Sequence, residues 1–579
     1  MKLIEALAIM AANASRVSEP MKTALVSGFT PLHLLTFLQA ELQLLFPSHR
    51  IEVTIGSYGD IPGTLKGLRG NEVDAIALVL EWEDLDSRLG IRQLGAWTAQ
   101  TPDDVIERTS MRLSLIRLLL EELKSSVPVV VSLPTLPLPP LFSTSGWQYS
   151  PWSLKLGEQL AAFAAMLGQH RRVRFLSEQR LNELSPPAQR LDVKSTWAAG
   201  FPYRMEHASV VAALLARLIK NPLPQKGLIT DLDNVLWSGI VGEVGAEHIT
   251  WDLDHHSQGH ALYQQFLNEL SEEGALIAAV SKNDPAVVEE AFRRKDLLLP
   301  ATKIFPFEVS WGSKATAVSA VLYQWNIGAD SVVFVDDDPL ELAEVKAAHP
   351  EVTCLQFPRK DPQAIYNLLV QLRDLFGKAE ISEEDRLRLE SIRSRATEKT
   401  FLTGVEGFSE ALLEQAAAEL TFSLKKDVGD ARALELINKT NQFNVNGRRF
   451  TEAAWQTHLR KDETFLLTAS YKDRFGSLGR IAVVSGRVNG SVLHVESWVM
   501  SCRAFARRIE HQCLRFLFDR FRSNSISFDY QRTERNGPLA AFLEQVNGEP
   551  PTSTVELLQD RFAASCPKLF HTVAEIADE

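Results

Sequence analysis

Three short apolar runs in the middle of the chain each end in reactive polar residues. The runs and the residues after them are GLIT with Asp231 and Asp233, LIAAV with Ser281, and VVFV with Asp336 and Asp337. Helical stretches separate the runs, and this alternation predicts parallel strands whose carboxyl ends meet in one crevice. The segment WGSK places Lys314 at the start of a helix beside that crevice. The sequence therefore predicts a carboxylate-rich site at one edge of a parallel sheet.

Carboxylates at this density suit phosphoryl transfer with Mg²⁺ as cofactor. Several carboxylates cannot share a small pocket unless a hard cation offsets their repulsion, and oxygen-only ligation favours Mg²⁺. We expect Asp231 to attack phosphorus, and Asp233 to protonate the leaving oxygen and then activate water. The predicted phosphate-binding residues are Ser281, Lys282, Asn283 and Lys314, and the predicted metal ligands are Asp231, Asp233, Asp336 and Asp337. An Asp after a strand is also a common turn residue, but four such motifs in this order favour catalysis.

The rest of the chain divides by its patterns into further regions. Residues 1–220 alternate strand-like and helix-like segments, which predicts another parallel α/β domain, and PLPQKG indicates a linker. The parallel-sheet domain with the acidic motifs spans 225–375, and an acidic, helical linker covers 376–418. Residues 419–579 begin with segments typical of antiparallel strands and continue into a helix, which predicts an α+β domain. The expected fold class is therefore multidomain α/β.

Bulk properties exclude several classes of protein. A net charge of -12 argues against nucleic acid as the main partner. No apolar run approaches the roughly 20 residues that span a bilayer, so no membrane partner is expected. The four cysteines are scattered and not in metal-ligand spacing, which favours a reducing, cytoplasmic location over a disulfide framework.

The central motifs match those of the haloacid dehalogenase superfamily, and DLDNVLWSGIVGEVG resembles the DLDNTLWGGVIGEDG pattern of its FkbH-like subfamily. The segments VSKND, WGSK, FVDDDPLELAEV, LINKTNQFNVNGRRFTEAAW and SCRAFARRIE are similar to later blocks of that family. The resemblance covers roughly Gly227 to the end, and the N-terminal domain more loosely. It implies a degenerate SGNH-hydrolase-like domain, a phosphatase-like domain with a Rossmann-like sheet, and an acetyltransferase-like (GNAT-like) domain.

The resemblance also implies an activity. Members of the subfamily take a glyceryl unit from 1,3-bisphosphoglycerate, remove its phosphates and load it on the phosphopantetheine arm of an acyl carrier protein for polyketide assembly. The chain departs from the pattern at Ser238 and Val244, which stand where the subfamily has Gly and Asp, in the loop expected to shape substrate selection. Two alternatives stay open: a phosphatase of another small metabolite, and a non-catalytic module that docks a carrier protein.

Cys502 is the candidate for thiol chemistry. It lies in MSCRAFARR, where neighbouring arginines would favour a thiolate. The alternative is a small buried residue without reactivity, because the thiol of the carrier arm can attack directly.

Residues for binding the carrier or its arm are expected in the last domain. In the pyrophosphate loop of acetyltransferases two glycines are common, but here Ala506 and Arg508 take their places, so acetyl-CoA binding is not expected. The basic residues Arg448 and Arg449 would face an acidic carrier protein together with Arg507 and Arg508, and the alternative is a solvated basic face. The predicted carrier or arm residues are Asn438, Lys439, Thr440, Asn441, Gln442, Arg503, Arg507 and Arg508.

Ser27 follows a predicted strand at the position of an SGNH nucleophile. No His and Asp at the expected spacing accompany it, and a lone Ser after a strand is usually a turn residue. We expect a non-catalytic scaffold or docking role for this domain.

Overall fold

The computed structural model describes the chain except for a set of short segments and one longer one. These are residues 15–17, 70–72, 94–101, 124–126, 141–146, 379–380, 382–384, 386–391, 393–409, 475, 502–503, 506, 534 and 577–579. The chain forms two compact units, one of Met1–Pro222 with Phe450–His458, the other of Leu223–Arg449 with Leu459–Glu579. None of the helices in the described part is long and apolar enough to cross a membrane.

The first unit is built on a five-stranded parallel sheet of order β2-β1-β3-β4-β5. The strands are β1 (Pro20–Ser27), β2 (Arg50–Ile55), β3 (Ala75–Val79), β4 (Val129–Ser132) and β5 (Val173–Phe175). The helices are α1 (Leu3–Ala14), α2 (Leu32–Leu45), α3 (Ile61–Gly67), α4 (Trp82–Leu85), α5 (Pro102–Glu121), α6 (Pro151–Leu167), α7 (Glu178–Leu184), α8 (Val193–Ala199), α9 (Met205–Lys220) and α19 (Glu452–Leu459). Short 3₁₀ turns lie at Ser87–Leu89 and Pro187–Gln189.

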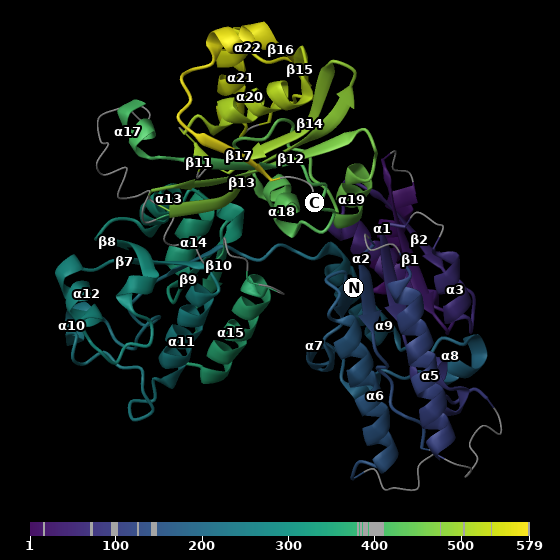
Figure 1. The fold of residues 1–579 in the computed structure, drawn as a ribbon. Coiled ribbons are helices and arrows are strands. Elements are labelled where there is room, and N and C mark those ends of the chain that lie inside the picture. Colours follow the sequence, from purple (N-terminus) through teal and green to yellow (C-terminus); the bar gives the residue numbers. More distant parts are fainter. Residues whose placement is uncertain are drawn as a thin grey trace. The chain divides into compact units, whose positions relative to one another are not determined.

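Burial on both faces explains why the inner strands β3 and β4 are almost wholly apolar. Leu25 of β1 belongs to a core with α1, α2 and α9, whereas its neighbours Ala24 and Val26 belong to a core with α3, α5 and α6. Successive side chains of a strand point to opposite faces, so a sheet covered on both sides needs apolar residues at every position. Figure 1 shows the two helix layers of this unit.

The second unit contains another five-stranded parallel sheet, of order β10-β9-β6-β7-β8. Its strands are β6 (Gly227–Thr230), β7 (Leu276–Ser281), β8 (Ile304–Val309), β9 (Val332–Asp336) and β10 (Thr353–Gln356). Its helices are α10 (Val241–Val244), α11 (Gln258–Glu272), α12 (Pro285–Phe292), α13 (Lys314–Trp325), α14 (Pro339–Ala348) and α15 (Pro362–Phe376), with 3₁₀ turns at Ala301–Lys303 and Ala329–Ser331. Leu228 packs with α11 and α15 on one face, and Ile229 packs with α13 on the other.

The last sheet of the second unit is mixed and has seven strands in the order β16-β15-β14-β13-β12-β11-β17. The strands are β11 (Glu419–Ser423), β12 (Thr464–Asp473), β13 (Gly476–Asn489), β14 (Val492–Met500), β15 (Ser525–Phe528), β16 (Val555–Leu558) and β17 (Thr572–Ile576). The helices are α17 (Glu410–Gln415), α18 (Ala431–Lys439), α20 (Ile509–Phe521), α21 (Gly537–Asn547) and α22 (Gln559–Ser565). One core joins this sheet to α20, α21 and α22, which Figure 1 shows together on one face.

The predicted multidomain α/β architecture is confirmed, with two parallel sheets and a third, mixed one. The segments expected as antiparallel strands in the last region form β12, β13 and β14, which pair antiparallel. The pair β14 and β15 is parallel, because a helix connects these two strands. Most of the acidic linker predicted at 376–418 lies outside the described residues. The likeness of the outer domains to SGNH hydrolases and acetyltransferases stays a prediction.

Candidate active site

The central parallel sheet brings two carboxylates together through adjacent strands. Strand β6 ends at Thr230 and β9 ends at Asp336, and the two strands pair with Thr230 opposite Val335. The backbone N–H of Asp231 continues this pairing by donating to the carbonyl oxygen of Val335 at 2.9 Å. Asp231 and Asp336 therefore emerge side by side at the carboxyl edge of the sheet, as the sequence predicted.

Lys314, the first residue of α13, lies between the two carboxylates. Its Nζ is 2.6 Å from Oδ2 of Asp336 and 3.0 Å from Oδ2 of Asp231. All three residues are buried, with at most 5% of any of them exposed. One ammonium faces two carboxylates in a place that excludes water, so the group retains a net negative charge that calls for a further cation.

The carboxylate oxygens of this site fit a hard divalent cation. Asp231, Asp336 and Asp337 each offer one oxygen, and these atoms lie within 4.8 Å of one another. Oδ1 of Asp231 is buried and has no hydrogen-bond partner within the described part of the chain. A buried carboxylate oxygen without a donor is costly unless a ligand satisfies it. Oxygen-only coordination with two or three carboxylates is the set that Mg²⁺ prefers.

Burial also shapes the electrostatics of the site. Loss of solvent raises the pKa of Asp231 to about 7, although Lys314 acts in the opposite direction. Burial likewise raises the pKa of Asp336 and of Asp337. Burial alone would lower the pKa of Lys314, but the two carboxylates outweigh it and raise that pKa to about 12. The lysine is therefore a permanent cation, and the carboxylates need a positive partner to stay ionised.

The Asp233 carboxylate has its own set of hydrogen-bond partners, and its predicted role as a metal ligand stays a prediction. Its Oδ1 accepts hydrogen bonds from Trp237 Nε1 at 2.9 Å and from the N–H of Val241 at 3.0 Å. Its Oδ2 accepts one from Asn283 Nδ2 at 2.8 Å. The group of carboxylate oxygens that can share a cation, among the described residues, does not include it. These bonds hold the carboxyl in one orientation, as a proton-transfer group requires.

Ser281 and Asn283 lie at the end of β7 and are both buried. Besides its bond to Asp233, Asn283 Nδ2 donates to Oγ of Ser281 at 3.1 Å. The structure thus makes Asn283 a support for the proton-transfer carboxyl and the serine. Lys282, which was predicted to bind phosphate, pairs with Glu341 of α14.

Several contacts of the site were not foreseen from the sequence. Arg359 Nη1 lies 2.7 Å from Oδ2 of Asp337 and orients this outer carboxylate. Trp237 lies in the loop after DLDN, and Val241 is the first residue of α10. Both belong to the segment that resembles the subfamily pattern, but the sequence marked this segment for substrate selection and not for holding Asp233.

The residues predicted around the arginine cluster differ in their surroundings. Cys502 and Arg503 lie outside the described residues. Arg507 is 6% exposed, with its Nε 3.7 Å from Oδ2 of Asp473 and its guanidinium over the ring of Tyr471. Its charge is thus balanced inside the domain by Asp473, and its predicted role in carrier binding stays a prediction. Arg508 pairs with Glu410 at 3.1 Å and donates to the carbonyl oxygen of Lys568 at 2.7 Å.

The amide-rich segment after α18 borders a small cavity in the second unit. Lys439, Thr440, Asn441 and Gln442 line this cavity, which has a volume of about 170 Å³. Basic side chains also line it, namely those of Lys226, Arg432 and Arg535. Asn438 is not among its lining residues. Arg449 donates to Asn441 and to the carbonyl oxygen of Ile437, which fixes the segment.

Ser27 shows the bonding of a turn residue. Its hydroxyl donates to the carbonyl oxygen of Phe29 at 2.9 Å, and the side chain is 5% exposed. This contact within the turn occupies the hydroxyl hydrogen and agrees with a non-catalytic interpretation.

Compared by sequence, the chain matches none of the known family profiles and none of the curated proteins. Compared by structure, it is similar to the N-terminal part of the protein BF1531 from Bacteroides fragilis, which contains a phosphatase domain and was crystallised with Mg. The TM-score is 0.53 at 20% identity, and the match covers 66% of this chain and 100% of that chain. A putative platelet activating factor protein from Streptococcus pneumonia gives a TM-score of 0.20 at 16% identity, over 38% of this chain and 92% of that one, too slight a likeness to support an inference. The chain shares the fold of the BF1531 fragment.

Proposed function

We propose that this chain is a Mg²⁺-dependent enzyme of phosphoryl transfer with Asp231 as its nucleophile. The observation that carries the proposal is the buried group in which Lys314 bridges Asp231 and Asp336 while Oδ1 of Asp231 has no partner in the described part of the chain. The structural relative BF1531 contains a phosphatase domain and was crystallised with Mg, which supports the same chemistry here.

The first half-reaction uses the carboxylate of Asp231. One of its oxygens forms a bond to phosphorus as the bond from phosphorus to the leaving oxygen breaks, which yields an aspartyl-phosphate. Asp233 gives its proton to the leaving oxygen, and Lys314 and the Ser281 hydroxyl bind phosphoryl oxygens. Mg²⁺ bound by Asp231, Asp336 and Asp337 supplies positive charge against the phosphoryl group and against the carboxylates themselves.

The second half-reaction returns the enzyme to its starting state. Asp233, now ionised, takes a proton from a water molecule, and the water oxygen forms a bond to phosphorus. The bond between phosphorus and Asp231 breaks, which releases inorganic phosphate and restores both carboxyl groups. The same side chain thus acts as acid and then as base, and the bonds from Trp237, Val241 and Asn283 keep it in place for both steps.

We further propose, on the motif resemblance, that the substrate is 1,3-bisphosphoglycerate and that the glyceryl group passes to the phosphopantetheine arm of an acyl carrier protein. The cavity lined by Thr440, Asn441 and Gln442 supports this proposal. Its amides can bond the amides of such an arm, while two basic side chains that border it are paired with carboxylates, Lys226 with Glu435 and Arg535 with Glu351. The arm thiol gives up its proton and attacks the acyl carbon of the substrate, and the bond from this carbon to the phosphate oxygen breaks. The products are a thioester and inorganic phosphate, so Cys502 is needed only if the transfer proceeds through a relay.

The test is to incubate the protein with Mg²⁺, 1,3-bisphosphoglycerate and a holo carrier protein, and to follow phosphate release and the intact mass of the carrier. Asp231→Asn removes the nucleophile, and Asp519→Asn, an exposed site on α20, is the matched control. The proposal predicts phosphate release and a glyceryl adduct with the control, and loss of dephosphorylation with Asp231→Asn.

Other outcomes separate the alternatives. Phosphate release without an adduct on any carrier supports a phosphatase of a small metabolite. Absence of both products with the wild-type protein and Mg²⁺ contradicts the enzymatic proposal. Unchanged loading by Cys502→Ala rules out a covalent relay through that thiol.

A further inference from the structure

The first unit contains a large cavity at the carboxyl edge of its parallel sheet. The volume is about 600 Å³, within the range of roughly 300 to 1,000 Å³ typical of ligand pockets. Gly28 and Phe29, which follow β1, line it together with Glu81, which follows β3, and Leu136, which follows β4. This cavity is separate from the phosphotransfer site and belongs to another sheet.

The cavity lies where the strand order of the sheet reverses. Strands β1 and β3 are neighbours, and the chain passes from β1 outward to β2 but from β3 to β4 on the other side. The crossover connections therefore diverge at the carboxyl ends of β1 and β3 and leave a crevice there. Open parallel sheets bind their ligands at such a point.

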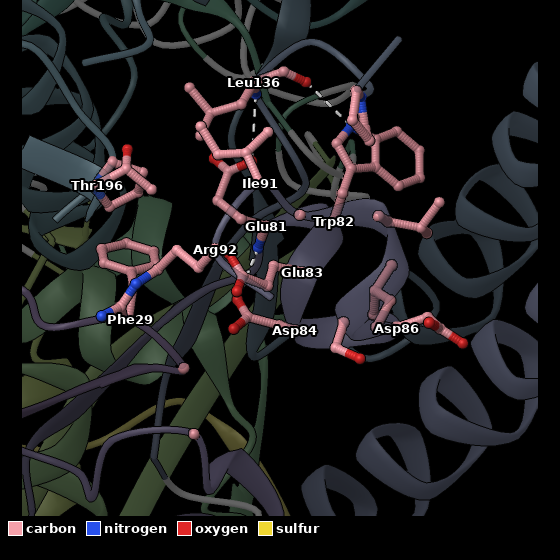
Figure 2. Close-up of a pocket in the computed structure, with 18 of the residues that line it drawn as sticks. Phe29, Glu81, Trp82, Glu83, Asp84, Asp86, Ile91, Arg92, Leu136 and Thr196 are labelled. Carbon is pink, nitrogen blue, oxygen red and sulfur yellow. Dashed lines mark hydrogen bonds between the residues drawn. The ribbon is translucent and has the colours of Figure 1, made fainter. Parts of the chain in front are cut away.

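Apolar side chains form most of the cavity wall. They come from the loop after β1, from α4 and the turn that follows it, from α5, and from the segment after β4; examples are Phe29, Trp82, Leu89, Ile91, Leu115 and Leu136. Trp82 Nε1 donates to the carbonyl oxygen of Leu136 at 3.0 Å, which fixes the indole and links two sides of the wall. Figure 2 shows Phe29 to the left of Glu81, Glu83 and Asp84, and Trp82 to their right.

One carboxyl, that of Asp84, is presented to this cavity by tight packing. Its Oδ2 accepts a hydrogen bond from the N–H of Glu81 at 2.8 Å. A Cβ atom placed on Gly28 would lie 1.8 Å from Asp84 Oδ1, so the carboxyl occupies the space that a side chain at position 28 would fill. Burial and the neighbouring carboxylates Glu81 and Glu83 raise the pKa of Asp84 to about 7. Near neutral pH this group can therefore both donate and accept hydrogen bonds.

Glu81 has a different task, because its own hydrogen bonds are already made. Its carboxylate accepts from Thr135 Oγ1 at 2.6 Å and from the Tyr203 hydroxyl at 2.6 Å, and also from the N–H groups of Thr135 and Leu136. It ties the loops after β3 and β4 together. Glu81 thus supports the cavity floor. Asp84 and Glu83 are the carboxyls that can form hydrogen bonds with a ligand.

Opposite charges on the same cavity restrict the ligand. The carboxyls of Glu83, Asp84 and Asp86 line it together with the guanidinium groups of Arg92, Arg108 and Arg112. Arg112 Nε donates to the backbone oxygen of Asp84 at 3.2 Å, and Arg92 contacts Tyr58. A strongly anionic ligand would meet the carboxyls and a strongly cationic one would meet the guanidinium groups, so a neutral ligand has the least electrostatic cost.

We propose that this cavity binds an uncharged small molecule that carries hydroxyl groups on an apolar body, with Asp84 bonding the hydroxyls. The apolar walls bury the body, and the few polar groups orient it. This binding function is independent of the phosphotransfer proposed for Asp231, so either can fail without the other.

The test measures binding of phenyl β-D-glucopyranoside to the full chain by ligand-observed NMR and calorimetry. Phenylacetate and benzyltrimethylammonium carry the same ring with a negative and a positive group. Met111→Trp fills the cavity from an exposed position on α5, and Leu118→Trp changes an exposed residue of the same helix that does not line the cavity. Asp84→Ala removes the hydroxyl-bonding group. Thermal melting of each variant confirms that it is folded.

The proposal predicts that the glucoside binds the wild type and Leu118→Trp with the same affinity and more tightly than either charged probe. Met111→Trp abolishes this binding, and Asp84→Ala weakens it by about tenfold, the effect of one hydrogen bond to an ionisable group. The proposal is overturned if the glucoside does not bind the folded wild type, if Met111→Trp binds it normally, or if a charged probe binds more tightly.

Discussion

Two parallel sheets of five strands carry a polar site at the same edge, and they use their carboxyl groups in opposite ways. In the central sheet, Asp231 and Asp336 are almost fully buried around one ammonium in a compact group. In the N-terminal sheet, Asp84 borders a cavity of about 600 Å³ with apolar walls. Two parallel sheets with different strand orders thus carry, at the same edge, either concentrated charge for a reaction or dispersed charge for recognition.

The difference between the two sites arises in the segments after the strands. Asp231 directly follows β6 and Asp336 is the last residue of β9, and both carboxylates contact Lys314, the first residue of α13. After β3 the chain forms the short helix α4. The carboxylate of its N-cap residue, Glu81, accepts hydrogen bonds from the hydroxyl groups of Thr135 and Tyr203. A carboxylate that accepts four hydrogen bonds has a structural role. A carboxylate with one oxygen that accepts none is available for catalysis.

The largest difference is expected when the same substitution, Asp to Asn, is made separately in each of the two sites. Asp231→Asn should lower phosphate release by at least about a thousandfold, because an amide does not replace an anionic nucleophile. Asp84→Asn should leave phosphate release unchanged, because the cavity takes no part in that reaction. Steady-state phosphate assays with Mg²⁺ measure both. Equal losses in the two variants would remove the distinction between the sites.

Removal of Lys314 should be the next largest effect, on stability. Lys314→Met leaves Asp231 and Asp336 buried without their cation, at a cost of roughly 3–5 kcal/mol. Added Mg²⁺ should restore more thermal stability to this variant than to the wild type, because the metal then offsets an unpaired charge. Thermal melts with and without Mg²⁺ measure this. A variant that gains no more from Mg²⁺ than the wild type would speak against a metal at these carboxylates.

Asn283→Ala tests whether the Asp233 carboxyl is oriented by its neighbours. We expect kcat to fall by about 10- to 100-fold with little change in KM, because a misaligned proton-transfer group slows the chemical step. Asn367→Ala, an exposed change on α15, is the control. Steady-state kinetics separate the two parameters. A rise in KM at unchanged kcat would assign Asn283 to substrate binding instead.

The smallest effect is expected in the pH dependence of stability at Asp84. Because its pKa is raised from 3.8 to about 7, the folded state holds an extra proton between these values. The stability this gives is fully present below the ordinary pKa and is lost as pH rises through about 7. Asp84→Asn lacks this loss, so its melting temperature relative to the wild type should rise by a few degrees from pH 5 to pH 8. A difference that is independent of pH would contradict the raised pKa.

The two sites also differ in how much of them could be predicted from the sequence. Asp231, Lys314 and Asp336 follow strands or open a helix, so the rule that strand ends converge was enough to bring them together. The cavity of the first unit depends on partners far apart in the chain, such as Glu81 with Tyr203, and no local pattern marks such a contact. In that domain the sequence drew attention to Ser27, which the structure shows in a turn.

Side-chain direction was the other limit of prediction. The sequence placed Asp233 among the metal ligands and proton-transfer groups, but it gave no sign that its carboxylate accepts hydrogen bonds from Trp237, Val241 and Asn283. Arg507 was expected to face a partner, yet it is buried against Asp473. The positions of both side chains depend on the conformation of loops, which the spacing of residues along the sequence does not determine.

The assignment of Asp231 as the nucleophile has one direct test, the trapping of its phosphorylated form. Acetyl phosphate has a leaving group that needs no protonation, so Asp233→Asn should accept its phosphoryl group in the presence of Mg²⁺ but should not hydrolyse it. Borohydride reduction then converts a phosphorylated aspartate to homoserine, which peptide mass spectrometry locates.

We predict homoserine at position 231, dependent on acetyl phosphate and Mg²⁺ and absent when Asp231→Asn is combined with Asp233→Asn. Homoserine at another aspartate, or phosphate release by the wild type with no trapped residue in Asp233→Asn, would contradict the assignment of Asp231.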